Sequence, residues 1–328
     1  MKKKYFGTDG IRGTAYEFPM NSDFLYNLAR AIKSNDKCIS RVLIGMDTRE
    51  SCKYIKNSLV NGFISCGVSC ECIEVVSTPI LCFYTKLSNY DLGIMISASH
   101  NPYEDNGVKI FKKNGEKLSD EEELSVEEKI ITKKNIKIED KIIKNKFKDL
   151  SKYEDFLLDK VVLPTNRLNN NIVMDCANGS LWDFAPKFFK KLKFNLVTYG
   201  CSPNGNNINQ GCGALEQRKL SEMTLKSNSD LGISFDGDAD RVIICDNKGN
   251  IIDGDVILAI IAYSLKKKGN EKISIVSTKM SNFSFREYIK NLNIKLSLSD
   301  VGDRYVVEKM KNSNSFVGGE PSGHIIFA

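Results

Sequence analysis

The sequence predicts an α/β protein made of repeated α/β domains. Short apolar runs alternate with amphipathic stretches along the chain, and this alternation is typical of strands joined by crossover helices. The alternation restarts twice, near residue 171 and near residue 273. A chain of 328 residues is also long enough for two to three domains, each with its own core.

In the first unit, apolar runs that end at small or polar residues predict strands, and the amphipathic stretches between them predict helices. The strands are expected over residues 41–46, 68–76 and 91–97, and the helices over residues 23–33, 50–66 and 79–87. Residues 112–148 are charged and poor in aromatic side chains, which predicts a peripheral helix followed by a connector.

The later units repeat this pattern. The strands are expected over residues 171–175, 231–235, 273–277 and 294–298, and the helices over residues 181–191, 281–292 and 302–311. We therefore expect three units, which occupy residues 1–150, 151–252 and 253–328.

Composition argues against several functional classes. The net charge is +6, but the basic residues are mostly lysines scattered among acids, whereas nucleic-acid grooves favour arginine and interleaved aromatics. No apolar run approaches a membrane span, and Gly7 to Gly10 interrupt any signal peptide after the N-terminal lysines. The ten cysteines include the close set Cys66, Cys70 and Cys72, but no histidine lies near them, so reduced thiols are expected. A cytoplasmic protein without a nucleic-acid or membrane partner is the resulting expectation.

The run from Ile94 to Pro102 places polar residues at the end of an apolar strand. Open α/β sheets bind ligands at the carboxyl ends of their strands, so the Ser99 hydroxyl is a candidate reactive group. The alternative is an ordinary strand-end turn, in which serine, asparagine and proline are common. A hydrolase-like pair of Ser99 with His100 is not favoured, because neighbours in an extended chain point to opposite sides.

A second apolar run, Leu231 to Phe235, leads into three aspartates at alternate positions, Asp236, Asp238 and Asp240. The small spacers let three carboxylates converge, and such a set suits Mg²⁺. An EF-hand is excluded, because its sixth position would be Arg241 and its twelfth Asn247. A solvated acidic turn remains an alternative, as does a phosphatase with Asp236 as nucleophile, although the latter leaves Ser99 unexplained.

The two loops share a preceding sequence. Asp91-Leu92-Gly93-Ile94 precedes the serine loop, and Asp230-Leu231-Gly232-Ile233 precedes the aspartate loop. In this alignment Ser99 falls opposite Asp238, which places both loops at the same position after equivalent strands.

Taken together, the motifs of the chain resemble those of the α-D-phosphohexomutases, in the family's order and over essentially the whole length. The matching segments are Tyr5 to Gly13, Gly45 to Ser51, Ser97 to Phe111, Asp175 to Gly179, Asn207 to Asn209, Asp236 to Arg241, Val301 to Tyr305 and Gly318 to His324. Within the family, the first and seventh of these segments are most similar to the members that act on glucosamine phosphate.

This resemblance implies mixed-sheet α/β domains around a central cleft and an isomerase that moves a phosphoryl group within a sugar phosphate. Glucosamine 6-phosphate and glucosamine 1-phosphate would interconvert through a phosphoserine and a bisphosphorylated sugar, for amino-sugar nucleotide and cell-wall precursor synthesis. A hexosamine or hexose 1,6-bisphosphate would serve as activator by phosphorylating Ser99. The resemblance also allows a homodimer.

The resemblance further implies roles for particular residues. Ser99, Arg12, Lys109 and His100 form the catalytic set, in which Arg12 grips phosphate and Lys109 assists proton transfer. Mg²⁺ is held by Asp236, Asp238, Asp240 and an oxygen on Ser99, with Arg241 supporting the loop. The sugar phosphate is bound by Gly302, Asp303, Arg304, Glu320, Ser322 and His324.

Two departures from the family keep alternatives open. Pro321 replaces the glutamine usual in glucosamine-specific members, which leaves phosphoglucomutase or phosphomannomutase activity as an alternative. The chain ends within an apparent strand at Ile325 to Ala328, so we expect an incomplete third domain with an exposed sheet edge and no phosphate-binding fourth domain. A catalytically impaired remnant and a Mg²⁺-dependent phosphohydrolase are the rival functions.

Overall fold

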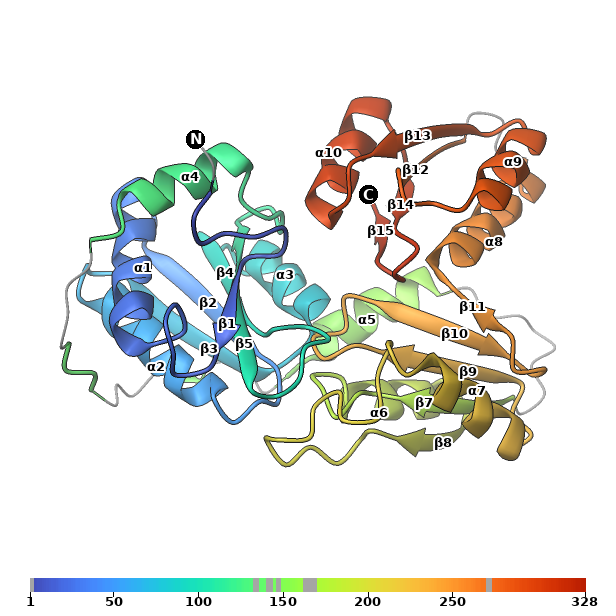
Figure 1. The fold of residues 1–328 in the computed structure, drawn as a ribbon, viewed down its shortest axis with the longest axis horizontal. Helices are drawn as coiled ribbons and strands as arrows, with labels where there is room; N and C mark the ends of the chain where they lie inside the picture. Colours follow the sequence, from blue (N-terminus) through green and yellow to red (C-terminus); the bar gives the residue numbers. More distant parts are fainter. Residues whose placement is uncertain (1–2, 132–135, 140–143, 146–148, 162–169, 270–272) are drawn as a thin grey trace.

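The computed structural model describes residues 3–131, 136–139, 144–145, 149–161, 170–269 and 273–328. Three sheets with flanking helices follow one another along the chain, and Figure 1 shows the first unit beside the other two. The repeated α/β architecture predicted from the sequence is confirmed. None of the helices in these ranges is long and apolar enough to cross a bilayer.

The first sheet has six strands in the order β1-β5-β4-β2-β3-β6, with β1 and β5 antiparallel to their neighbours. Its strands are β1 (Ile11–Thr14), β2 (Arg41–Met46), β3 (Ser69–Val75), β4 (Leu92–Ile96), β5 (Asp105–Lys112) and β6 (Lys144–Asn145). Its helices are α1 (Ser22–Asn35), α2 (Cys52–Ile64), α3 (Thr78–Leu87) and α4 (Asp120–Glu128). The expected peripheral helix corresponds to α4, and most of the expected connector after residue 131 lies outside the described residues.

Side-chain alternation along the strands divides the core of this unit between two faces. Val42 and Ile44 pack with α1, α2 and α4, whereas Leu43 packs with Ile80 and Leu81 of α3. The hydroxyl of Ser77 caps the N-terminus of α3, because it accepts a hydrogen bond from the Ile80 N–H. The strands β3 and β4 are both parallel to β2, so they end at the same edge of the sheet. Because α3 follows directly after β3, the N-terminus of α3 lies at this edge, where β4 also ends.

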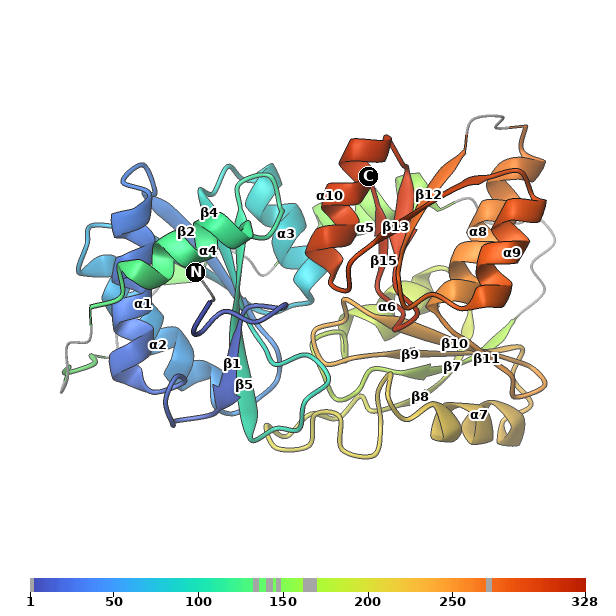
Figure 2. The same ribbon diagram turned by 45° about the horizontal axis from the view of Figure 1, so that its top comes forward.

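The second sheet has the order β11-β10-β9-β7-β8, and the third has the order β13-β12-β14-β15. The second unit contains α5 (Ser151–Lys160), β7 (Asn171–Asp175), α6 (Phe184–Lys191), β8 (Asn195–Tyr199), α7 (Gln217–Lys226), β9 (Leu231–Phe235), β10 (Val242–Asp246) and β11 (Ile251–Ile252). The third contains α8 (Gly254–Lys267), β12 (Ser274–Thr278), α9 (Phe283–Asn291), β13 (Lys295–Ser299), α10 (Asp303–Ser313), β14 (Val317–Gly319) and β15 (Ile325–Phe327). Figure 2 shows the third unit packed beside the second. The strand β15 is an edge strand, and its Phe327 is 57% exposed.

The short sequence repeat marks equivalent strands. Both β4 and β9 lie between one parallel and one antiparallel neighbour. In both, the repeat's glycine leaves room for a threonine hydroxyl from a covering helix: a Cβ on Gly93 would lie 2.4 Å from Oγ1 of Thr85, and one on Gly232 would lie 2.2 Å from Oγ1 of Thr224. The serine and aspartate loops therefore follow equivalent strands, as the alignment predicts.

Candidate active site

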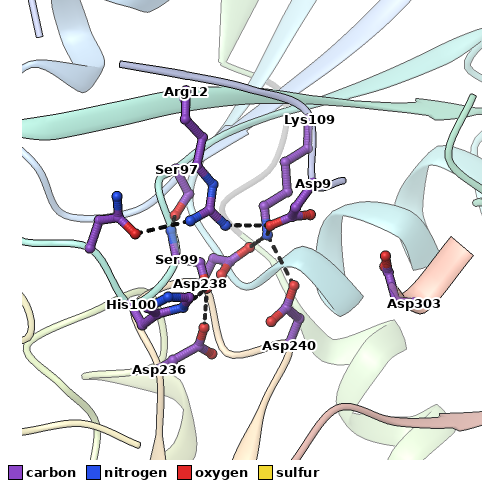
Figure 3. A network of polar contacts seen from close by, with 12 residues as sticks. Asp9, Arg12, Ser97, Ser99, His100, Lys109, Asp236, Asp238, Asp240 and Asp303 are labelled. Carbon is purple, nitrogen blue, oxygen red and sulfur yellow. Dashed lines mark hydrogen bonds and ion pairs between the residues drawn. The ribbon is translucent and has the colours of Figure 1, made fainter. Parts of the chain in front are cut away.

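The serine loop and the aspartate loop meet between the first two domains, as Figure 3 shows. The Ser99 hydroxyl donates a hydrogen bond to Oδ2 of Asp236, although the residues lie 137 positions apart. Ser99 is fully buried and adopts a left-handed backbone conformation, with φ of 54°. Its N–H is satisfied by the Ser97 hydroxyl at 2.9 Å. The hydroxyl is therefore held in one direction, toward the aspartate loop.

Two side chains bind the backbone of the serine loop from outside. Asn209 donates through Nδ2 to the carbonyl oxygens of Ser99 and Asn101, at 2.9 Å in each case. Arg49 donates through Nη2 to the same two oxygens, at 3.3 Å and 2.6 Å. Gly237 allows this close approach of the domains, because a Cβ there would lie 2.4 Å from the Ser99 carbonyl oxygen. Asn209 thus ties the backbone of the loop to the second domain, and Arg49 ties it to the first domain.

His100 lies beside Ser99, contrary to the sequence-based argument that their side chains diverge. That argument assumed an extended chain, whereas the positive φ of Ser99 turns the backbone and brings Nδ1 of His100 to 3.3 Å from the Ser99 Oγ. Burial, Arg241 and Arg12 lower the pKa of His100 to about 4, so the ring is neutral at pH 7. Because Nη1 of Arg241 can only donate, at 3.2 Å, Nδ1 is an acceptor and the ring proton is on Nε2.

The three predicted aspartates converge. One carboxylate oxygen from each of Asp236, Asp238 and Asp240 lies within 4.8 Å of the others. Oδ2 of Asp238 and Oδ2 of Asp240 each accept from Lys109, whereas the Oδ1 atoms of both are buried without a hydrogen-bond partner among the described residues. Buried carboxylate oxygens left in this way are the ligands expected for a hard divalent cation. The site therefore fits the predicted metal.

The protonation of the aspartates reflects their crowding. Burial and the neighbouring charges of Asp240 and Asp238 raise the pKa of Asp236 to about 8. Burial also raises the pKa of Asp238, whereas Lys109 lowers the pKa of Asp240 despite its burial. Without a cation the set cannot be fully ionised at pH 7, so cation binding would release a proton.

Lys109 is the buried centre of the charge network, with a side chain only 1% exposed. Its Nζ lies 2.7 Å from Asp238, 3.0 Å from Asp240 and 2.9 Å from Asp9. These carboxylates raise its pKa well above the ordinary value despite burial. The family resemblance implies that Lys109 assists proton transfer, a role that would require a lowered pKa, whereas the carboxylates around it raise its pKa.

Arg12 and Arg241 line one cavity of about 310 Å³ together with His100 and the segment from Tyr5 to Gly10. Arg12 donates to Asp9 and, at 3.0 Å, to Asn101, and the backbone N–H of Arg241 donates to Asp236 at 3.2 Å. The Nε atoms of both arginines are buried without a hydrogen-bond partner among the described residues, and Nε of Arg241 lies 3.9 Å from Oδ1 of Asp240. A cavity with two guanidinium groups beside Ser99 can accept an anionic group such as phosphate.

The predicted sugar loop approaches the same network from the third domain. His324 lies 3.9 Å from both Asp240 and Asp303, and Asp303 pairs with Lys117 at 2.6 Å. Oε1 of Glu320 accepts from the Gly302 N–H at 2.8 Å, and its Oε2 has no hydrogen-bond donor among the residues that the structure describes. Ser322 is exposed. Four of the six predicted substrate residues therefore form one connected set with the metal loop.

Arg304 faces a different way. Its Nη1 donates to Glu123 at 2.8 Å and to the Leu118 carbonyl at 3.2 Å, and it lies 2.9 Å from Asp120. The next residue, Tyr305, donates to Asp120 at 3.0 Å. In this structure Arg304 thus joins α10 to α4 and lies apart from the residues around Ser99.

The sequence analysis missed several residues of the network. Asp9 accepts from Lys109, Lys117 and Arg12 at once. It lies within the segment from Tyr5 to Gly13 that resembles the family, so the sequence could have indicated it. Thr78 donates to Asp238 from the start of α3, and Lys117 bridges Asp9 to Asp303. The sequence around Thr78 and Lys117 does not indicate a role for either residue, because their partners lie far away along the chain.

The chain matches the phosphoglucomutase/phosphomannomutase family over three segments. These are α/β/α domain I over residues 3–137, domain II over residues 151–249 and domain III over residues 253–328. Among solved structures, a putative phosphomannomutase from Thermus thermophilus superposes with a TM-score of 0.84 at 22% identity, covering 98% of this chain and 75% of that one. A phosphoglucomutase/phosphomannomutase family protein from Burkholderia thailandensis gives a TM-score of 0.83 at 22% identity, covering 98% and 71%. At this identity these structures establish the fold.

Curated relatives are closer in sequence. Phosphoglucosamine mutase from Zymomonas mobilis is 42% identical over 100% of this chain and 75% of its own length. Phosphoglucosamine mutase from Chlamydia felis is 40% identical over 99% of this chain and 73% of its own length. The chain therefore belongs to the phosphoglucomutase/phosphomannomutase family of phosphohexose mutases.

Proposed function

We propose that this enzyme is a phosphoglucosamine mutase, which interconverts glucosamine 6-phosphate and glucosamine 1-phosphate. The observation that carries the proposal is the identity of 40–42% with proteins of that name over 98–100% of the chain. The putative phosphomannomutase of known structure is only 22% identical to this chain, and so is the solved structure described as a phosphoglucomutase/phosphomannomutase family protein. Amino-sugar nucleotide and cell-wall precursor synthesis would use the product.

In the proposed reaction Ser99 carries the phosphoryl group. The bond from phosphorus to Oγ of Ser99 breaks as a bond to the free sugar hydroxyl forms, and the proton that this hydroxyl loses is balanced by the proton that Oγ of Ser99 regains. The bisphosphorylated sugar then turns in the site and returns its other phosphoryl group to Oγ of Ser99. Support comes from the burial of Ser99 and from the two side chains that fix its loop. A hexosamine or hexose 1,6-bisphosphate would prime the resting enzyme.

Asp236, Asp238 and Asp240 would hold Mg²⁺ together with a phosphoryl oxygen on Ser99. When bound, the cation neutralises negative charge on the phosphoryl oxygens during transfer. In the unphosphorylated protein the Ser99 hydroxyl donates a hydrogen bond to Oδ2 of Asp236. Phosphorylation of Ser99 replaces this hydroxyl hydrogen, so Oδ2 becomes available as a metal ligand. One solved family structure, of N-acetylphosphoglucosamine mutase from Aspergillus fumigatus, is described with its sugar phosphate and magnesium. The orphaned Oδ1 atoms of Asp238 and Asp240 support a comparable site in this chain.

The remaining residues act by position and charge. We assign Arg12 to binding phosphate in the cavity beside Ser99, and Arg241 to supporting the metal loop. Lys109 supplies a fixed positive charge behind Asp238 and Asp240, because its raised pKa keeps it protonated. Glu320, Ser322 and His324 are assigned to the sugar, and Glu320 has one carboxylate oxygen to offer. His100, with a pKa of about 4, is a weak base, so it serves as a neutral contact beside the phosphoryl group.

Phosphate labelling tests the proposal. After incubation with glucosamine 1,6-bisphosphate, mass spectrometry should locate one phosphate on Ser99. Ser99→Ala should abolish labelling, whereas Ser97→Ala should keep it, since Ser97 contributes only a hydrogen bond to the loop. A label on Asp236 would favour the phosphatase alternative. Steady release of inorganic phosphate in place of isomerisation would favour a hydrolase.

Substrate competition tests the choice of sugar. Glucosamine, glucose and mannose 6-phosphates would be offered together, and the product of each would be measured. The glucosamine phosphate should give the highest kcat/KM. Preference for mannose or glucose phosphate would assign the chain to another branch of the family, and Pro321 would then be the first residue to exchange, for glutamine.

A further inference from the structure

The Asp238 carboxylate is held in an asymmetric way. Its Oδ2 accepts from both Oγ1 of Thr78 and Nζ of Lys109, the latter at 2.7 Å. Its Oδ1 is buried and has no hydrogen-bond partner among the described residues. All the donors thus lie on one oxygen, and the other oxygen is left for a ligand from outside the protein.

Thr78 is suited to set this orientation. It is the first residue of α3, where a threonine hydroxyl has no helical carbonyl four residues back to bind, so the hydroxyl can point outward. Its branched side chain restricts χ1, and the residue is only 6% exposed. Its backbone N–H also donates to the Asp238 carbonyl at 2.9 Å. Thr78 therefore holds both the backbone and the side chain of Asp238.

Lys109 is less suited to the same task. Its ammonium is shared among Asp238, Asp240 and Asp9, at distances of 2.7–3.0 Å. An ammonium between several carboxylates can pair with either oxygen of each, whereas the Thr78 hydroxyl donates to a single oxygen, Oδ2 of Asp238. Without that hydroxyl, the Asp238 carboxylate could rotate and turn both oxygens toward Lys109.

We propose that Thr78 is a positioning residue of the metal site, whose hydroxyl turns the Asp238 carboxylate so that Oδ1 faces a divalent cation. The inference rests on the proposed function in one respect, the assignment of the three aspartates to a cation. Because Thr78 belongs to the first domain and Asp238 to the second, the cation site is complete only when these two domains are docked.

Hydrogen bonds to metal-ligating carboxylates typically contribute a factor of 10–100 to metal affinity. Thr78→Val keeps the branched shape and removes the hydroxyl, so we expect the Kd for Mn²⁺ to rise about tenfold. Thr78→Ser keeps the hydroxyl and should bind Mn²⁺ nearly as the wild type does. Thr78→Ala provides a second variant without the hydroxyl, should the valine fit poorly.

Thr85 provides the matched control. It lies in the same helix, is fully buried and uses its hydroxyl to donate to the Leu81 carbonyl at 2.8 Å, away from the aspartates. Thr85→Val therefore removes a buried hydroxyl without touching the site. Its Mn²⁺ affinity should stay at the wild-type value even if its melting temperature falls.

The measurement is titration of Mn²⁺ followed by electron paramagnetic resonance of the free ion, on the full chain, with the phosphate content of Ser99 matched by intact mass. A rise in Kd for Thr78→Val and Thr78→Ala, with rescue by serine and no change in Thr85→Val, supports the inference. Unchanged affinity in both hydroxyl-free variants would overturn it, as would an equal loss in Thr85→Val. A wild-type protein that binds no Mn²⁺ would instead refute the metal assignment, and this inference with it.

Discussion

Arg304 donates to the carboxylate of Glu123 at 2.8 Å, and this pair joins α10 of the third domain to α4 of the first. The two side chains are only 9% and 5% exposed. Glu123 also pairs with Lys3 at 2.7 Å, and Arg304 also pairs with Asp120 at 2.9 Å, so each residue keeps one ion pair when the other is removed. The position of the third domain relative to the first therefore depends on both residues.

Removing the arginine should loosen this contact. We expect Arg304→Gln to lower the free energy of unfolding by on the order of 2 kcal/mol, because hydrogen bonds to buried carboxylates are lost, and to speed amide exchange in α4 and α10. The double variant with Glu123→Gln should lose less than the sum of the single variants, because the two side chains contact each other directly and share one interaction. Arg218→Gln breaks an exposed pair with Glu222 and is the control, with no measurable change expected. Additive losses in the cycle would contradict this interpretation.

The second prediction concerns the fixing of the serine loop. In Asn209→Asp the shape is kept, but an oxygen replaces the nitrogen that donates to the carbonyls of Ser99 and Asn101. Repulsion should shift the loop, and a displacement of about 1 Å can cost roughly 100-fold in rate. We expect kcat to fall about 10–100-fold on that basis, with a smaller change in KM.

Asn206→Asp introduces the same charge at an exposed position of the same segment and should leave kcat unchanged. If kcat fell equally in both variants, the added negative charge would be the cause, and the proposed effect on the position of the serine loop would be wrong.

Hydrophobic patterning predicted the strands that carry the site. The bounds of β2, β7 and β9 are those expected from their apolar runs. The strand β5 was missed, because its interior contains Asn106 and Lys109, and Lys109 is buried by ion pairs. Hydrophobicity carries no information about a side chain that is buried in this way.

The same limit applies within the candidate site. Ser99 and the three aspartates each follow a strand, so their meeting could be predicted from the sheet topology. The orientation of His100 could not, since it depends on the positive φ of Ser99. Contacts such as Thr78 with Asp238 join residues 160 positions apart in different domains, and no local pattern encodes them.

The third prediction concerns stability without metal. The pKa of Asp236 is raised to about 8, so the folded state binds its proton more tightly than the unfolded state does. The stability from this proton is complete below the ordinary pKa near 4 and is lost as the pH rises to about 8. The lowered pKa of His100 acts in the opposite direction, but only between about 4 and 6.5. Of these two groups, only Asp236 titrates between pH 6.5 and 8, where it lowers the stability.

We therefore expect the melting temperature of the unphosphorylated, metal-free protein to fall from pH 6.5 to 8. One such group contributes at most about 1.4 kcal/mol per pH unit. Asp236→Asn resembles the protonated carboxyl and should flatten the profile, and Mg²⁺ should reduce the slope by competing with the proton. Thermal unfolding at fixed ionic strength, with and without chelator, measures these profiles. A slope that persists in Asp236→Asn would assign it to another group.

The last prediction is the effect of Asp238→Asn, for which the structure fixes the direction of the new amide. Thr78 and Lys109 both donate to Oδ2, so the asparagine must turn its carbonyl oxygen toward them. Its NH₂ group then occupies the position of Oδ1 and points at the other carboxylates. An amide nitrogen presents hydrogens and no lone pair to a cation, so Mn²⁺ binding and phosphoryl transfer should both be lost. The donors remain satisfied, so the melting temperature should stay near that of the metal-free wild type. Asp300→Asn removes an exposed carboxylate paired with Lys279 and should retain both activities. Full Mn²⁺ binding by Asp238→Asn would show that the cation does not contact Oδ1 of this residue.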